Sequence, residues 1–189
     1  MFKRRHPRKI MTHIREFFWP SMGWYRFFKL LKIRVLRLRD TPRNIAVGLA
    51  SGASFSFSPF MGTHILQAAG FSFMARGNIL AAVIGTLFGN PWTFPFIWFV
   101  SLYAGLWISK MAGFPIAPDL INDLSVDNVW HVITTAPRHI LWPWIMGGYV
   151  LTVLTYPIFY GISYVMIKNV QTTRASLSTR PKQKRANKT

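Results

Sequence analysis

The chain has 189 residues, of which 51% are hydrophobic and 16% aromatic, with a mean hydropathy of +0.23 and a formal net charge of +18. Of its 23 Lys and Arg residues, 13 lie in residues 1–43, 3 in 44–139 and 7 in 140–189. Such a charge can indicate nucleic acid, but long uncharged apolar tracts beside the basic ends exclude an ordinary DNA-binding domain, and we expect no nucleic-acid partner. The absence of cysteine excludes disulfides, thiol chemistry and cysteine-ligated metals.

Residues 1–43 form a basic N-terminal segment, in which Pro7 and Pro20 prevent one continuous helix. Residues 24–39 predict an amphipathic helix, because their apolar side chains fall on one stripe at helical spacing. We interpret this stretch as an interfacial helix held by anionic lipid, and the alternative is an arm that binds nucleic acid. The side chains assigned to lipid headgroups are Arg26, Lys29, Arg37 and Arg39.

Three apolar tracts follow, at 44–75, 77–110 and 140–167. A straight spanning helix needs about 20 residues, so the first two tracts are too long for one crossing, and each is interrupted near its middle. We therefore expect 44–75 to form a re-entrant helical hairpin or a pair of short helices, and 77–110 to form a broken helix. The third tract should be a transmembrane helix flexed at Pro143 and Pro157, which neighbouring helices and water can tolerate.

The distribution of charge predicts the topology. Basic residues flank the apolar tracts at both ends, which places both termini in the cytoplasm and makes the number of complete crossings even. The intervening segment 111–139 carries three Asp residues and should face the periplasm. We therefore predict an all-α integral membrane protein. Its membrane domain, 44–167, lies between the basic N-terminal segment and a disordered basic cytoplasmic tail at 168–189.

Small residues lie four apart in both halves of the core. This spacing gives each helix a smooth face that permits close approach of another backbone. Duplicated broken helices indicate a transporter-like site, and the alternative is that the small residues only pack the two halves together. Asn44 and Asn78, which precede them, suit helix N-caps. The glycines concerned are Gly48, Gly52, Gly85 and Gly89.

The two interruptions are the candidate functional positions, because non-helical backbone at membrane depth must be buried in protein or line a water-filled cavity. His64 could relay protons or line a pore, and the alternative is a neutral histidine that bonds a freed carbonyl. Asn90 could orient a solute or cap exposed backbone at the proline. Thr63, Gln67 and Thr93 could line a polar path or bond their own helix. The candidates are Pro59, Gly62, His64, Asn90, Pro91 and Thr93.

We predict no catalytic residues, metal or cofactor, and hence no enzyme. The apolar core contains no Asp or Glu, and the chain has no Ser/His/Asp order and no phosphate-cradling glycine motif. His131 and His139 lie eight apart around Pro137, which is too irregular a spacing for a metal site.

The chain resembles a bacterial inner-membrane family of unknown function, DUF2062, over roughly residues 25–167. The string Gly-Asn-Pro-x-Thr-x-Pro, from Gly89 to Pro95, is the most specific part of this resemblance. Further matching positions are Pro42, Ala46, Gly48, the Pro59/Gly62 interruption and Asn78. The resemblance implies a multi-pass inner-membrane protein without an assigned activity, so it transfers no catalytic or binding residue.

Two functions fit these residues. The first is a small permease or channel-like protein, as a homo-oligomer, with a pathway at the Pro59/Gly62 and Asn90/Pro91 interruptions. An interior without acidic groups favours a neutral solute, a lipid or an anion over a cation. The second is a non-transporting membrane scaffold or envelope-assembly accessory, whose basic tails bind anionic lipid or a cytoplasmic partner.

Overall fold

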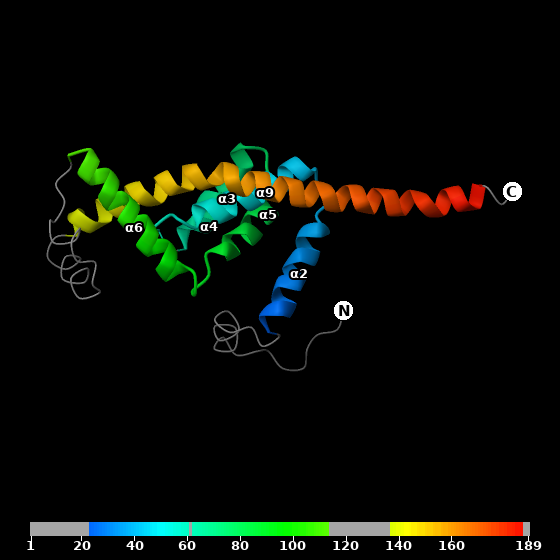
Figure 1. The fold of residues 1–189 in the computed structure, drawn as a ribbon, viewed down its shortest axis with the longest axis horizontal. Helices are drawn as coiled ribbons and strands as arrows, with labels where there is room; N and C mark the ends of the chain where they lie inside the picture. Colours follow the sequence, from blue (N-terminus) through cyan, green and yellow to red (C-terminus); the bar gives the residue numbers. More distant parts are fainter. Residues whose placement is uncertain (1–22, 61, 114–136, 187–189) are drawn as a thin grey trace. The chain divides into compact units, whose positions relative to one another are not determined.

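The computed structural model describes residues 23–60, 62–113 and 137–186, and it contains helices and no strands in those ranges (Figure 1). The all-α prediction is therefore confirmed for the described residues. The chain divides into two units, Met1–Arg37 and Leu38–Thr189. The helices are α2 (Trp24–Leu36), α3 (Pro42–Phe55), α4 (Thr63–Met74), α5 (Ile79–Gly85), the 3₁₀ helix η1 (Thr86–Phe88), α6 (Phe94–Met111) and α9 (Arg138–Ala186).

Helix α2 is the described part of the first unit. It begins after Gly23, whose φ of 75° suits glycine, and it ends at Leu36, three residues before the predicted end at residue 39. The Arg37 amide closes it by donating to the carbonyls of Ile33 and Arg34. The four side chains assigned to lipid headgroups are all exposed: Arg26, Lys29, Arg37 and, beyond the helix in the second unit, Arg39.

The second unit is built around α3, which contacts α4, α5, η1 and α9, while α6 packs against α9. Helix α3 begins with Pro42 at its first position and Thr41 as its N-cap, whose hydroxyl accepts from the Asn44 amide at 3.2 Å. The expected N-cap at Asn44 is therefore wrong, because a threonine followed by proline starts the helix earlier. Asn78 does cap α5, accepting from the Ala81 amide at 2.9 Å.

A hydrogen-bond cluster around Asp40 joins the starts of α3 and α5. The carboxylate accepts from the Thr41 amide at 2.7 Å. It also accepts from the side-chain amides of Asn44 at 2.8 Å and Asn78 at 3.0 Å. Gln171 of α9 donates to the Asp40 carbonyl at 3.1 Å. The one acidic residue of the described ranges thus links three helices.

Partial burial acts to raise the pKa of the Asp40 carboxyl, but hydrogen bonds from Asn78, Thr41 and Asn44 outweigh it and hold the pKa below its usual value of 3.8. A pKa lowered by folding contributes stability that is fully present above the ordinary pKa. That stability is lost as the pH falls through the lowered pKa of the folded state.

Helices α3 and α5 touch backbone to backbone because their facing positions are small. A Cβ added to Gly48 would overlap the Asn78 carbonyl, and one added to Gly52 would overlap the Ala82 carbonyl. A Cβ on Gly85 would lie 2.5 Å from the Leu49 carbonyl oxygen. These three glycines pack the two halves of the core together.

Helices α6 and α9 cross in the same manner, at a place that the sequence analysis did not single out. A Cβ on Gly105 would overlap the Pro143 carbonyl, and one on Gly147 would overlap the Ser101 carbonyl. The available signal was the small residues Ser101, Gly105 and Ser109, which lie four apart on α6.

Helix α9 is continuous from Arg138 to Ala186, through Pro143, Pro157 and Pro181 (Figure 1). Residues 168–186 are therefore helical, which differs from the disordered tail predicted for 168–189. Extending a formed helix adds one backbone hydrogen bond for each residue other than proline without a new nucleation cost, and this segment contains one proline, Pro181, and no glycine. Helix α9 also extends the predicted 140–167 helix by two residues at its start. The predicted periplasmic segment, 111–139, lies mostly outside the described residues, as do residues 1–22.

Among the described residues, two helices are long and apolar enough to cross a membrane, α6 and the Arg138–Arg174 part of α9. Both present large apolar side chains outward: Phe96 of α6 is 72% exposed, and Val153 of α9 is 71% exposed. Water would disfavour such a surface, whereas lipid would cover it.

We predict that Asp40→Ala lowers the free energy of unfolding at neutral pH by about 1–2 kcal/mol, the value of charge-assisted hydrogen bonds discounted for partial exposure. Thermal unfolding of the purified protein measures this effect, with the exposed neighbour Arg39→Ala as the control. The difference between wild type and Asp40→Ala should shrink as the pH falls below 3.8, where the wild-type carboxylate is progressively protonated. A difference of constant size across that range would contradict the assignment of the effect to the carboxylate.

Candidate functional site at the two helix breaks

The two interruptions of the core lie together in the structure. The first break, residues 56–62, joins α3 to α4, and the second break, residues 89–93, joins η1 to α6. The His64 ring, just after the first break, packs edge-on against the Phe94 ring, just after the second, with their centroids 5.5 Å apart. A Cβ on Gly89 of the second break would lie 2.9 Å from the Ser56 Cβ of the first. The two breaks therefore lie against each other, through His64 and Phe94 and through Ser56 and Gly89.

The backbone of the first break is bonded by its own side chains. Gly62 has a φ of 86°, which suits glycine, and its amide donates to His64 Nδ1 at 3.2 Å. Because Nδ1 accepts this bond, it carries no proton in this arrangement. His64 is 6% exposed, and its imidazole also has a hydrogen-bond partner in the Phe60 backbone. The Thr63 hydroxyl donates to the Phe60 carbonyl at 3.1 Å.

The second break is closed by two polar side chains around half-buried Pro91. The Asn90 side-chain oxygen accepts from the amides of Trp92 at 2.9 Å and Thr93 at 3.0 Å. The Thr93 hydroxyl donates to the Phe88 carbonyl at 2.7 Å and accepts from the Asn90 amide at 2.9 Å. Both side chains therefore cap the backbone that the proline leaves exposed.

Helices α6 and α9 lie over the first break, and their hydroxyls donate hydrogen bonds to backbone carbonyls of the break and of the end of α3. The Ser101 hydroxyl of α6 donates to the Phe57 carbonyl at 3.3 Å, and the Thr152 hydroxyl of α9 donates to the Ser54 carbonyl at 3.0 Å. A Cβ on Gly148 would lie 2.6 Å from the Phe57 carbonyl oxygen, so α9 lies against the break backbone.

Buried serine hydroxyls make the end of α3 and the first break polar inside. Ser51 and Ser56 donate to backbone carbonyls four residues earlier, at 2.6 Å and 3.0 Å. Ser54 and Ser58 are also buried, at 0% and 1% exposure, and their hydroxyls have no hydrogen-bond partner among the described residues. A buried polar group left unpaired costs about 1–3 kcal/mol. The sequence analysis assigned these serines no role.

The remaining predicted residues lie as follows. Pro59 is half-buried beside Gly148 of α9, where an added Cβ would meet Pro59 Cδ at 3.1 Å. Gln67 of α4 donates to the Thr63 hydroxyl at 3.0 Å and accepts from the Tyr149 hydroxyl at 3.0 Å. Within the described ranges, no group of three or more His, Cys, Asp or Glu could hold a metal ion.

A cavity of about 570 Å³ lies elsewhere, between the C-terminal end of α6 and the N-terminal end of α9. None of the residues that line it belongs to either break, so it forms a second, separate feature of the molecule.

No curated protein and no solved structure matches the chain. A family described as an uncharacterized protein conserved in bacteria, DUF2062, matches residues 25–176, which include both breaks. The match covers well over half of the chain, and it confirms the resemblance carried by the Gly89–Pro95 string. The chain belongs to the DUF2062 family.

Proposed function

We propose that the protein is a multi-pass protein of the bacterial inner membrane and a small permease or channel-like protein, whose pathway passes the two helix breaks. The observation that carries this proposal is a pair of buried hydroxyls without partners among the described residues, Ser54 at the end of α3 and Ser58 in the first break. A hydroxyl in this position is satisfied by water or by a polar solute that passes it.

The helix lengths support the membrane arrangement. Helices α3 and α4 have 14 and 12 residues, or about 21 Å and 18 Å at 1.5 Å per residue, and both are shorter than the roughly 30 Å of hydrocarbon. They form a re-entrant pair that returns to its own side. Helices α5 and α6 form one crossing interrupted at the second break, and α9 forms the other. Two crossings place both termini in the cytoplasm, as the basic ends favour.

Reporter fusions test this topology. Fusions at residue 123 and at residue 189 of the full chain should report the periplasm and the cytoplasm respectively, because charge and helix length both favour two crossings. A matched fusion at Arg76, between α4 and α5, should report the cytoplasm if α3 and α4 are re-entrant. A periplasmic signal at Arg76 would contradict the re-entrant pair, and a cytoplasmic signal at residue 123 would contradict the two-crossing arrangement.

The interior chemistry restricts what could pass. The polar side chains at and beside the breaks carry hydroxyls, an amide and an imidazole, and none of them is acidic. A cation path through an apolar protein needs a fixed countercharge or a ring of carbonyls, and the carbonyls here already accept bonds from Ser101, Thr93 and Thr152. A neutral polar solute, a lipid or an anion fits this lining better.

A specific observation favours the second candidate, a non-transporting scaffold. Several backbone groups at both breaks are bonded inside the protein, by His64, Asn90 and Thr93. In this function the breaks are packed joints that shape the membrane domain, and the basic ends bind anionic lipid or a cytoplasmic partner. Ser54 and Ser58 then turn to bond carbonyls of their own helix turn.

Cysteine accessibility separates the two candidates, and the native absence of cysteine makes the background clean. Ser54→Cys and Ser58→Cys change only oxygen to sulfur, and in proteoliposomes a pathway predicts that both react with a small, anionic, membrane-impermeant thiol reagent. The matched control is Ser72→Cys on α4, which is equally buried and also lacks a partner but lies outside the breaks.

Labelling at residues 54 and 58 with protection at residue 72 would support the pathway. Protection at all three positions would favour the scaffold, provided that denaturation exposes each thiol to the same reagent and thermal unfolding shows that the variants are folded.

A further inference from the structure

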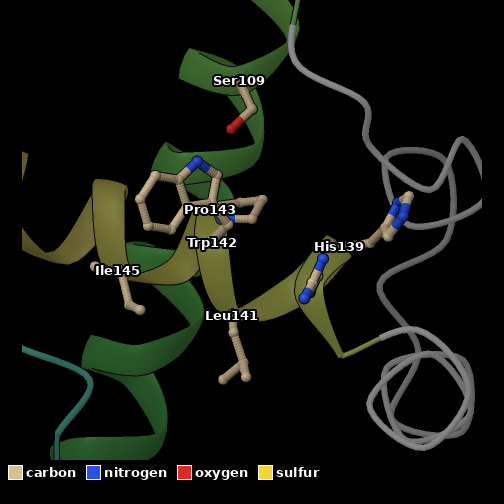
Figure 2. Close-up of a pocket in the computed structure, with 7 residues that line it drawn as sticks. Ser109, His139, Leu141, Trp142, Pro143 and Ile145 are labelled. Atoms are coloured by element: carbon tan, nitrogen blue, oxygen red, sulfur yellow. The ribbon is translucent and has the colours of Figure 1, made fainter.

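The cavity between α6 and α9 is lined by apolar side chains together with Ser109 and His139 (Figure 2), and Arg138 also lines it. Its volume of about 570 Å³ falls in the range of small-ligand sites. The close-up in Figure 2 shows Ser109 on α6 above the side chains of Trp142 and Pro143 on α9. The lining residues are Ser109, Arg138, His139, Leu141, Trp142, Pro143 and Ile145.

The glycine crossing of α6 and α9 shapes this cavity. The two helices are held in backbone contact where Gly105 meets Pro143 and Gly147. Ser109 lies one helical turn beyond Gly105 on the same face of α6. The close contact at Gly105 and Gly147 therefore fixes the spacing of α6 and α9, and the cavity lies one helical turn beyond that contact.

Two buried polar groups of the cavity have no hydrogen-bond partner in the part of the chain that the structure describes. Ser109 is 1% exposed, and its hydroxyl makes no hydrogen bond among the described residues. In Figure 2 the Ser109 hydroxyl points toward the indole and the proline of α9. His139 Nδ1 is likewise buried without a partner. A cavity with such groups offers hydrogen bonds that a polar ligand group could complete.

The described residues at this end of the two helices carry positive charge. Arg138 lines the cavity and is exposed, Lys110 lies in the last turn of α6, and no acidic side chain is found among the described residues that line the cavity. The first turn of α9 adds the positive end of a long helix. These features together favour an anionic group.

The walls favour a hydrocarbon chain. Leu141 and Trp142 are 48% and 55% exposed, so the apolar side of the cavity is open to the surroundings of α9. A phospholipid is larger than the cavity, and it would place its headgroup region inside while its acyl chains follow the outer surface of α9. Tryptophan at the end of a spanning helix is typical of the headgroup level of a bilayer.

We propose that this cavity binds a membrane phospholipid with an anionic headgroup. The Arg138 guanidinium and the start of α9 hold the phosphate, the Ser109 hydroxyl donates to an ester or glycerol oxygen, and Leu141, Trp142 and Ile145 contact the acyl chain. This inference rests on the membrane placement proposed above, but it does not depend on a pathway at the breaks.

Photocrosslinking tests the site locally, which matters because the basic N-terminal segment also attracts anionic lipid. The full-length protein is reconstituted with phosphatidylglycerol that carries a photoreactive group near the ester, or with the phosphatidylcholine analogue. The crosslinked peptides are then mapped by mass spectrometry. We expect crosslinks within residues 138–145 from phosphatidylglycerol, several-fold more than from phosphatidylcholine.

The substitutions have matched controls. Arg138→Gln should reduce the crosslinks at 138–145 by about tenfold, the size expected for a charge-assisted contact, and Arg138→Lys should retain most of them. Ser109→Ala should reduce them about threefold, as expected for one neutral hydrogen bond. Arg76→Gln, which removes another exposed arginine, and Ser72→Ala, which removes another buried unpaired hydroxyl, should leave them unchanged.

Two results would overturn the proposal. Equal crosslinking by the two lipids, or by wild type and Arg138→Gln, would show an apolar groove that any lipid fills. Loss of the crosslinks on adding inorganic phosphate at millimolar concentration would indicate a site for free phosphate. The reporter fusions measure the membrane topology separately from the crosslinking. A failure of the membrane placement is therefore distinguishable from a failure of this lipid site.

Discussion

The close approach of helix backbones at glycine is the contact on which the second unit depends. At Gly48, Gly52 and Gly85, helix α3 lies against α5 with no room for a side chain, and at Gly105 and Gly147 the same holds for α6 and α9. In a membrane the hydrophobic effect gives helices little reason to associate, so contacts of this kind supply much of the association energy. A larger side chain at any of these positions would separate the helices, and it would move the breaks or the cavity apart.

These contacts also explain where the polar groups lie. Because α3, α6 and α9 come together at the first break, hydroxyls of Ser101 and Thr152 reach carbonyls at the end of α3. At the opposite end of α3, Asp40 forms hydrogen bonds that join α3, α5 and α9. The helices are thus held by glycine contacts along their length and by hydrogen bonds at their ends. The buried hydroxyls that lack a partner among the described residues are those of Ser54, Ser58, Ser72 and Ser109.

Much of the helical framework could be predicted from local sequence. Proline and glycine residues separate α3 from α4 and α5 from α6. Small residues four apart mark the helix faces that pack closely. Both signals can be read from the sequence because each acts within one or two helical turns. The choice of partner for each face is not local. Nothing near Gly105 in the sequence indicates that it meets Gly147, so the α6–α9 cavity could not be anticipated. The N-cap of α3 was misassigned because Thr41 and Asn44 are both good caps, and only the position of Pro42 decides between them. The segment beyond residue 168 was predicted to be disordered because it is basic, but a basic composition only predicts exposure to solvent. A continuing helix exposes those side chains as well as a disordered chain does.

The meeting of the two breaks is the central claim, and an engineered disulfide measures it most directly. Ser56 and Gly89 belong to different breaks, and a Cβ at residue 89 would lie 2.9 Å from the Cβ of residue 56. This is shorter than the separation of about 3.5–4.5 Å found across disulfides, so a small outward shift of the two backbones brings the thiols into bonding range. Ser56→Cys combined with Gly89→Cys should form an intramolecular disulfide in native membranes under mild oxidation. A control pair, Ser56→Cys with Gly70→Cys, places the second thiol at an exposed position of α4 where an added Cβ would meet no neighbouring atom within 4 Å. Rapid bridging of the first pair alone is the expected result. Two thiols at 56 and 89 that stay free under oxidation in the folded protein, or that bridge no faster than the control pair, would contradict the arrangement.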